Sequence, residues 1–161
     1  MMTAETEAEI NAPATLVWGV ILDLDRYPEW NPFIVKVDCP GGPRIGASIG
    51  LHLRWGRPDG KEIVSRERIK RIEPPKAGPD SVSRALYGYG FDGALAKLGL
   101  IYSYRDETLE QASGGKTRYC TRVEVRGPAG RLAPMSLIQH GIERQTTALK
   151  VRCEMLKSRR A

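Results

Sequence analysis

The stretch that decides the fold runs from Ile10 to Cys39 and reads INAPATLVWGVILDLDRYPEWNPFIVKVDC. It starts at the end of a predicted strand, continues through an apolar helical segment and a second short helical turn, and then resumes as extended chain. Two short helices inserted between the first two strands indicate a curved sheet that helices close over. A hollow between the sheet and the helices is where we expect a small molecule to fit.

The segment before this stretch is predicted to be a half-buried strand. Residues 3–10 alternate, with Thr6, Ala8 and Ile10 on one face and glutamates on the other. Asn11 is expected to cap the helix that follows, and Pro13 fits its first turn because a missing N–H costs nothing there. The apolar stripe of this helix is then formed by Leu16, Val17, Val20 and Ile21.

The rest of the chain is predicted to form six more strands and one long helix. The predicted strands are residues 34–37, 47–55, 61–73, 83–89, 101–111 and 117–126. Pro74 and Pro75 are expected to end the third of these. Residues 132–156 show a helical period through Ile138, Ile142, Gln145, Leu149, Cys153 and Leu156. A helix of that length measures about 37 Å and can cross the concave face of a seven-stranded sheet.

Composition and length favour a single globular domain spanning residues 1–161. Hydrophobic residues make up 41% of the 161 residues and charged residues 27%, which is ordinary for a globular protein. No run of about 18 apolar residues predicts a membrane-spanning helix. The acidic start lacks the apolar core of a secretory signal, so we expect a cytoplasmic protein.

The cysteines and histidines do not predict a metal site. Cys39, Cys120 and Cys153 are scattered along the chain, as are His52 and His140, whereas zinc ligands cluster at short spacings. We therefore expect no metal and interpret the cysteines as free thiols.

The net charge of +6 raises the question of an anionic partner. The basic residues are dispersed, with groups at residues 66–71 and in the tail at 157–160, which is typical of a solvated surface. Nucleic acid or an anionic membrane surface is the weaker interpretation. We expect no nucleic-acid partner, no stable membrane insertion, and a monomer or homodimer.

Three motifs carry a resemblance to a known superfamily. They are NAPAxxVW at residues 11–18, DxxxYPEWNPFI at residues 23–34 and GxTRY at residues 115–119. With the closing helix, this pattern resembles the START-like, or SRPBCC, superfamily, which includes birch-pollen allergens, lipid-transfer domains and aromatic polyketide cyclases. The resemblance covers nearly the whole chain. It implies an α+β helix-grip fold, in which a curved antiparallel sheet of about seven strands wraps around a long C-terminal helix and encloses a cavity.

Glu67 is the first candidate for chemistry. Ile63 and Ile69 mark the inner face of their strand, and that face also carries Ser65, Glu67 and Arg71. A carboxylate facing an apolar cavity is costly unless paired or protonated, so we expect burial to raise the pKa of Glu67 and suit it to proton transfer. An ion pair with Arg105 or Arg71 is the structural alternative.

Residues 101–111 leave two registers open. If Leu109 faces inward, then Ser103, Arg105 and Glu107 face inward with it; the opposite register turns Tyr102, Tyr104 and Asp106 inward. In the first case Arg105 can hold a carboxylate or enolate oxygen, although it can equally pair with an acidic neighbour. We take Glu67, Arg105 and Glu107 as the candidate catalytic residues.

The candidate substrate-binding residues are aromatic or polar side chains on predicted inner faces. They are Trp55, Ser65, Tyr87, Tyr89, Tyr102, Tyr119, Thr121 and Gln145. Ordinary strand packing is the alternative for the tyrosines. Residues 88–100 are glycine-rich and are interpreted either as a lid over the cavity mouth or as a tight bend.

Two functions remain open at this stage. The resemblance to polyketide cyclases implies an enzyme that needs no cofactor and cyclises a hydrophobic or polyketide-like molecule by positioning and acid/base proton transfer. The alternative is a carrier or sensor that holds a lipid or aromatic ligand in the same cavity without chemistry.

Overall fold

The computed structural model describes residues 1–57 and 59–160 of the chain. One antiparallel sheet of seven strands has the order β1-β7-β6-β5-β4-β3-β2. The strands are β1 (Met2–Ile10), β2 (Ile34–Asp38), β3 (Ser48–Arg54), β4 (Glu62–Ala77), β5 (Ser83–Phe91), β6 (Tyr102–Gln111) and β7 (Thr117–Arg126). The helices are α1 (Ala14–Leu22), η1 (Leu24–Glu29), α2 (Ala94–Lys97), η2 (Gly130–Leu132) and α3 (Met135–Arg160).

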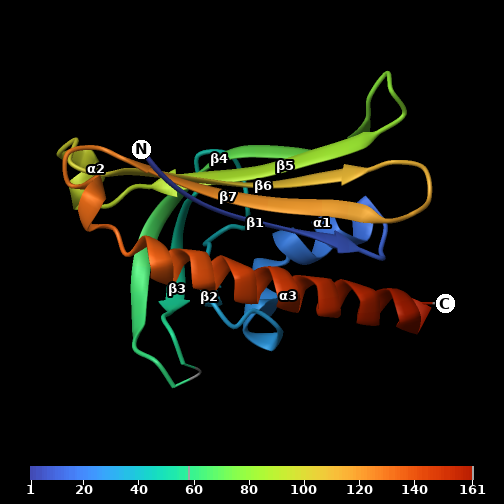
Figure 1. Cartoon of the computed structure of the whole chain (residues 1–161), viewed down its shortest axis with the longest axis horizontal. Helices are drawn as coiled ribbons and strands as arrows, with labels where there is room; N and C mark the ends of the chain where they lie inside the picture. The colour runs from blue at the N-terminus through green and yellow to red at the C-terminus, as the bar shows by residue number, and fades with distance from the viewer. Residues whose placement is uncertain (58, 161) are drawn as a thin grey trace.

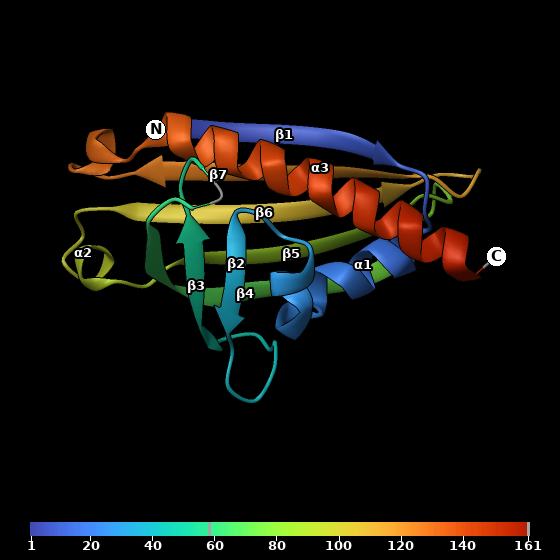
Figure 2. The same ribbon diagram turned by 90° about the horizontal axis from the view of Figure 1, so that it is seen from below.

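The long helix α3 runs across the concave side of the sheet, as Figures 1 and 2 show from two directions. It packs against β1 and α1, and α1 in turn contacts β4, β5 and β6. The core lies between these layers. This arrangement confirms the predicted helix-grip α+β fold. In the described part of the chain, no helix is long and apolar enough to cross a bilayer.

The inner face of the sheet follows from strict alternation in β7. Thr117, Tyr119, Thr121, Val123 and Val125 are buried, and the residues between them are exposed or half-buried. Side chains of a strand point to opposite faces in turn, so five consecutive inward positions determine the orientation of the whole strand. The inner-face placement predicted for Tyr119 and Thr121 is confirmed.

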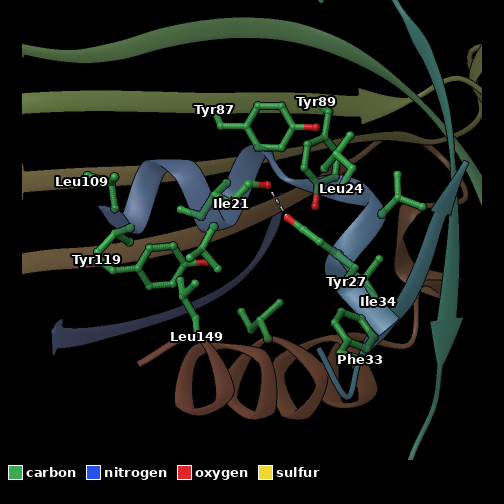
Figure 3. Packing of buried hydrophobic residues seen from close by; sticks show 14 of the residues in the cluster. Ile21, Leu24, Tyr27, Phe33, Ile34, Tyr87, Tyr89, Leu109, Tyr119 and Leu149 are labelled. Carbon is green, nitrogen blue, oxygen red and sulfur yellow. Dashed lines mark hydrogen bonds between the residues drawn. The ribbon is translucent and has the colours of Figure 1, made fainter. Parts of the chain in front are cut away.

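Tyrosines from several elements meet in the core. Figure 3 shows Tyr27 of η1 together with Tyr87, Tyr89 and Tyr119 of the sheet, above Leu149 of α3. The hydroxyl of Tyr27 donates a 2.9 Å hydrogen bond to the carbonyl oxygen of Ile21. This bond ties η1 to α1, and it satisfies a phenolic group that would be costly to bury unpaired.

The predicted cap of the first helix is wrong. Pro13 occupies the cap position and no side chain of the preceding loop bonds there. Instead, the side-chain oxygen of Gln111 accepts a 2.6 Å hydrogen bond from the N–H of Ala14. The Asn11 side chain accepts one from Lys157 Nζ, at 2.9 Å. The start of α1 is therefore capped by a strand residue that lies 97 positions away in sequence, which local sequence cannot reveal.

Two β-bulges change the predicted course of β4. The strand continues past Pro74 and Pro75 to Ala77, with a register shift between Glu73 and Lys76 that accommodates the missing N–H groups. A second shift separates Ile69 from Arg71 and breaks the alternation. Arg71 is exposed and pairs with Glu73, so the prediction that Arg71 faces inward is wrong.

The long helix is displaced from its predicted bounds. It begins at Met135, because Pro134 separates it from the single turn of η2, and it continues to Arg160. Lys157, Arg159 and Arg160 occupy the last turn, where cations interact favourably with the helix dipole.

Candidate active site

A cavity of about 560 Å³ lies between the sheet, the start of α3 and the loops around α2 and η2. Most of its wall is apolar. Five of the predicted site residues line it: Trp55, Ser65, Glu67, Tyr89 and Arg105. The structure therefore gathers part of the predicted site around one space.

Among the described residues that line this cavity, Glu67 is the only one with a carboxyl group. It lies on β4, and the Ser65 hydroxyl two residues earlier donates a 2.6 Å hydrogen bond to its Oε1. Burial raises the pKa of Glu67 to about 7, although the Ser65 bond and the positive charge of Arg105 oppose that rise. A carboxyl group with this pKa exchanges protons readily at neutral pH.

Arg105 brings the cavity its positive charge. It lies on β6, directly opposite Tyr89 of β5, and its guanidinium carbon is 5.9 Å from the centre of that ring. The residue is only 6% exposed. Its Nε donates a 2.9 Å hydrogen bond to Thr121 Oγ1. Its Nη2 is buried and makes no hydrogen bond in the described structure; this nitrogen is on the side of the guanidinium that faces Glu107.

A buried polar layer holds Arg105 from behind. Glu107 Oε1 is 3.7 Å from Arg105 Nη2, and Glu107 Oε2 accepts a 2.8 Å hydrogen bond from the Tyr119 hydroxyl. Glu107, Tyr119 and Thr121 are all buried and none of them lines the cavity. Their position supports the guanidinium rather than contacting a ligand in the cavity.

Two further predicted residues are buried outside the cavity wall. Tyr87 is buried on β5 with its ring centre 5.3 Å from that of Tyr89. Gln145 is fully buried on α3, and neither polar atom of its amide has a hydrogen-bond partner among the described residues. Both residues belong to the core.

Tyr102 does not reach the cavity. It is 55% exposed, at the start of β6, and so lies on the opposite face from Ser103 and Arg105. The register that turns Ser103, Arg105 and Glu107 inward is confirmed, and the alternative with Tyr102, Tyr104 and Asp106 inward is wrong. Tyr102 faces inward only in that second register, and the sequence of this strand has few apolar residues to mark a face.

Most of the apolar wall is formed by residues that the sequence patterns do not assign to the site. Lining residues outside the predicted site include Phe33, Leu53, Ile101, Leu132 and Ile138. Phe91 and Leu95 also line it and come from residues 88–100, the segment interpreted as a lid or a tight bend. Phe33 had a usable signal in the WNPF motif: Asn31 is buried, and its Oδ1 accepts hydrogen bonds from the N–H groups of Phe33 and Ile34. This turn directs the Phe33 ring against Trp55, with the ring centres 5.4 Å apart.

The comparison with protein families agrees with this architecture. A family described as polyketide cyclase/dehydrase and lipid transport matches residues 1–154. The chain belongs to this family. Its assignment to the START-like superfamily, first indicated by the motifs at residues 11–34, is thereby confirmed.

Among curated relatives, this family member is 25% identical over 132 residues to oxopyrrolidines biosynthesis cluster protein O of Penicillium oxalicum, covering 71% of the chain. It is 30% identical over 64 residues, or 40% of the chain, to the abscisic acid receptor PYL7 of Arabidopsis thaliana. The matches span 62% and 29% of those two proteins.

Among solved structures, the ZhuI aromatase/cyclase of Streptomyces sp. R1128 superposes with a TM-score of 0.66 at 16% identity. That match covers 95% of this chain and 93% of the other. At this identity the likeness establishes the shared fold.

Proposed function

We propose that this protein binds a hydrophobic, polyketide-like small molecule in its cavity and catalyses its cyclisation, with Glu67 as the proton-transfer group. The observation that carries the proposal is the Glu67 carboxyl group, whose pKa lies near 7, in an otherwise apolar wall beside Arg105. Such a pKa leaves roughly half of the carboxyl groups ionised at neutral pH, so the group can both accept and return a proton.

The proposed reaction is an intramolecular aldol closure. The Glu67 carboxylate removes a proton from a carbon between two carbonyl groups, and the Arg105 guanidinium stabilises the enolate oxygen that forms. The enolate carbon then attacks a second carbonyl carbon of the same chain, forming a C–C bond and an alkoxide. Protonated Glu67 returns the proton to that alkoxide, so the carboxylate is regenerated and no other reactant is consumed.

The apolar wall supplies the rest of the catalysis. A flexible chain held between Phe33, Trp55 and Tyr89 has fewer conformations, and this raises the effective concentration of its reacting carbons. The buried layer of Glu107, Tyr119 and Thr121 keeps Arg105 in place, which makes these three residues positioning residues in the proposal. Glu107, a predicted catalytic residue, thus acts through Arg105.

A carrier or sensor is the second candidate function. The apolar lining of the cavity favours it as well, since such a lining binds hydrophobic molecules whether or not chemistry follows. In a carrier, Glu67 and Arg105 only orient the ligand. Removing the Glu67 carboxyl group then changes the affinity for the ligand, and no catalytic rate is lost because no reaction occurs.

The test uses a synthetic poly-β-ketone thioester as substrate and mass spectrometry to detect the cyclised product. Glu67→Gln keeps the size of the side chain and abolishes its proton transfer, so we expect ring closure to fall by about 100-fold or more. Binding of the same thioester, followed by Tyr and Trp fluorescence, should change by less than about fivefold.

Glu73→Gln is the matched control, because Glu73 lies on the same strand with its side chain exposed and away from the cavity. It should cyclise the substrate at the wild-type rate. If wild-type protein binds the thioester but accelerates no ring closure over buffer, the carrier function replaces the cyclase.

A further inference from the structure

We infer that a surface groove between α1 and the C-terminal half of α3 binds a small aromatic carboxylate. The groove has a volume of about 340 Å³, at the lower end of the range for small-molecule sites. Figures 1 and 2 show α1 beside this half of α3, at the opposite end of the long helix from α2. None of the described residues that line the groove also lines the cavity, so the inference does not depend on the chemistry proposed there.

Two facing helix stripes form the walls of the groove. Leu16 and Val20 of α1 line it from one side, and Arg152, Leu156 and Arg160 of α3 line it from the other. Residues four positions apart lie on the same face of a helix, so each helix presents one continuous stripe to the groove. The groove therefore combines apolar contact with positive charge.

Gly19 of α1 lines the groove between these stripes, and packing does not explain why it is a glycine. It lies inside the helix, where glycine is less favourable than any residue except proline. A Cβ at this position would meet no atom within 4 Å, so the chain has room for a side chain. The glycine keeps this part of the groove open to solvent, as the ring of a bound ligand requires.

The charges around the groove favour an anion. Arg26 lies 3.4 Å from Asp23 and 3.1 Å from Glu29, and Arg152 Nη2 donates a 2.6 Å hydrogen bond to Glu29 Oε2. Arg160, which also lines the groove, forms no ion pair with any described residue. Three guanidinium groups thus face two carboxylates, and one positive charge remains uncompensated.

An aromatic carboxylate matches both parts of the lining. The planar guanidinium group binds a carboxylate through paired N–H donors. The Arg152 side chain is only 16% exposed, so a carboxylate beside it is less screened by water than in an ordinary surface ion pair. Trp30, directly after η1, and Leu156 both line the groove and offer apolar surface to the aromatic ring.

The three tryptophans of the chain let one experiment follow the groove and the cavity separately. Trp30 lines the groove, Trp55 lines the cavity, and Trp18 lines neither. Protein labelled with fluorotryptophan is titrated with phenylacetate and with its neutral analogue phenylacetamide, and Trp→Phe variants assign the ¹⁹F NMR resonances. We expect phenylacetate to shift the Trp30 resonance, with an affinity about threefold to fivefold higher than that of phenylacetamide.

Gly19→Leu fills the groove with a side chain that suits a helix. It should weaken the response of Trp30 to phenylacetate by about tenfold or more and leave any response of Trp55 unchanged. Because Trp30 also borders a hollow beside β2, this variant is needed to place the ligand in the groove.

Two charge variants test the role of Arg160. Arg160→Gln should weaken phenylacetate binding by about threefold to fivefold and leave phenylacetamide binding unchanged. Arg159→Gln makes the same change of charge at a neighbouring residue that does not line the groove, and it should have a much smaller effect. Gly19, Arg159 and Arg160 are all exposed, and thermal melts should show that the variants remain folded.

Three results would overturn the inference. The first is a Trp30 resonance that phenylacetate leaves in place. The second is a Trp30 shift that persists at the same concentrations in Gly19→Leu, because the ligand would then lie outside the groove. The third is equal affinity for phenylacetate and phenylacetamide, because the guanidinium groups would then select no anion.

Discussion

The hydroxyl of Tyr119 donates a 2.8 Å hydrogen bond to Oε2 of Glu107, and both residues are almost completely buried. This bond fixes one oxygen of a carboxylate whose other oxygen lies 3.7 Å from Arg105 Nη2. Since buried polar groups that lose a partner are costly, the layer beneath the cavity stays ordered only while each member keeps its bonds.

Tyr119→Phe should therefore destabilise the protein by about 1–3 kcal/mol, because it leaves Glu107 Oε2 without a donor. Urea denaturation measures this free energy. Tyr102→Phe removes the same hydroxyl from an exposed ring with no described partner and should change stability by less than about 0.5 kcal/mol. Equal effects of the two variants would show that the buried bond contributes nothing.

Glu67 should make stability depend on pH in an unusual direction. Its pKa rises from 4.5 to about 7 on folding, so between these values the folded state holds a proton that the unfolded state has lost. Raising the pH through this range therefore costs stability, by roughly 2 kcal/mol once solvent screening of this half-buried group is allowed for.

Glu67→Gln removes this cost, so the variant should gain stability over wild type as the pH rises, with most of the gain reached just above pH 7. Urea unfolding of both proteins at about pH 5 and about pH 8 measures the difference. Glu73→Gln provides the exposed control. A Glu67→Gln effect that is identical at the two pH values would contradict the raised pKa.

His52 should make the stability of the protein depend on pH at higher pH values than Glu67 does. Its Nε2 lies 2.7 Å from Asp38 Oδ2 and its Nδ1 lies 2.7 Å from Glu62 Oε1, which links β2, β3 and β4. Hydrogen bonds that the His52 ring donates to these two carboxylates raise its pKa above the usual 6.5. The stabilisation is complete below about pH 6.5 and is lost as the pH rises through the raised value.

His52→Gln should accordingly lower the melting temperature more at about pH 6 than at about pH 9. Differential scanning calorimetry across this range gives the comparison. His140→Gln, which replaces an exposed histidine of α3, is the control for loss of an imidazole. A His52→Gln effect that grows with pH would reverse the sign of the argument.

Gly141 should resist substitution because α3 passes directly over Phe33. A Cβ at this position would lie 2.5 Å from two ring atoms of Phe33, which lines the cavity and packs on Trp55. Gly141→Ala is expected to cost about 1–3 kcal/mol of stability. Gly19→Ala in α1, where no atom lies within 4 Å, should instead stabilise by about 0.5–1 kcal/mol. Thermal unfolding of the two variants tests this contrast.

Periodicity predicted the fold because the decisive elements are long and regular. The alternation from Thr117 to Val125 and the helical period around Leu149 each repeat often enough to define a buried face. Prediction failed where an irregularity intervened. The bulge after Ile69 turned Arg71 outward, and no residue in that stretch signals a bulge in the way a glycine often does.

Regular alternation along the strands also predicted part of the candidate site. Glu67 and Arg105 come from inward positions that apolar neighbours on their own strands mark, namely Ile69 and Leu109. The wall formed by Phe33, Leu132 and Ile138 depends on how loops and the long helix approach the sheet, which no local pattern encodes. Tyr119 and Thr121 were correctly placed inward, but only the structure separates residues behind the cavity from those that line it.

The most direct test of the central claim is a titration of the Glu67 carboxyl carbon by ¹³C NMR, with Glu67→Gln used to assign the resonance. The account predicts a midpoint near pH 7 in the ligand-free protein, because the apolar cavity disfavours the charged carboxylate. A midpoint at the ordinary value near 4.5 would show a carboxylate that is fully ionised and stabilised at neutral pH. Glu67 would then lack the proton that it has to return in the proposed ring closure, and the cyclase mechanism would be contradicted.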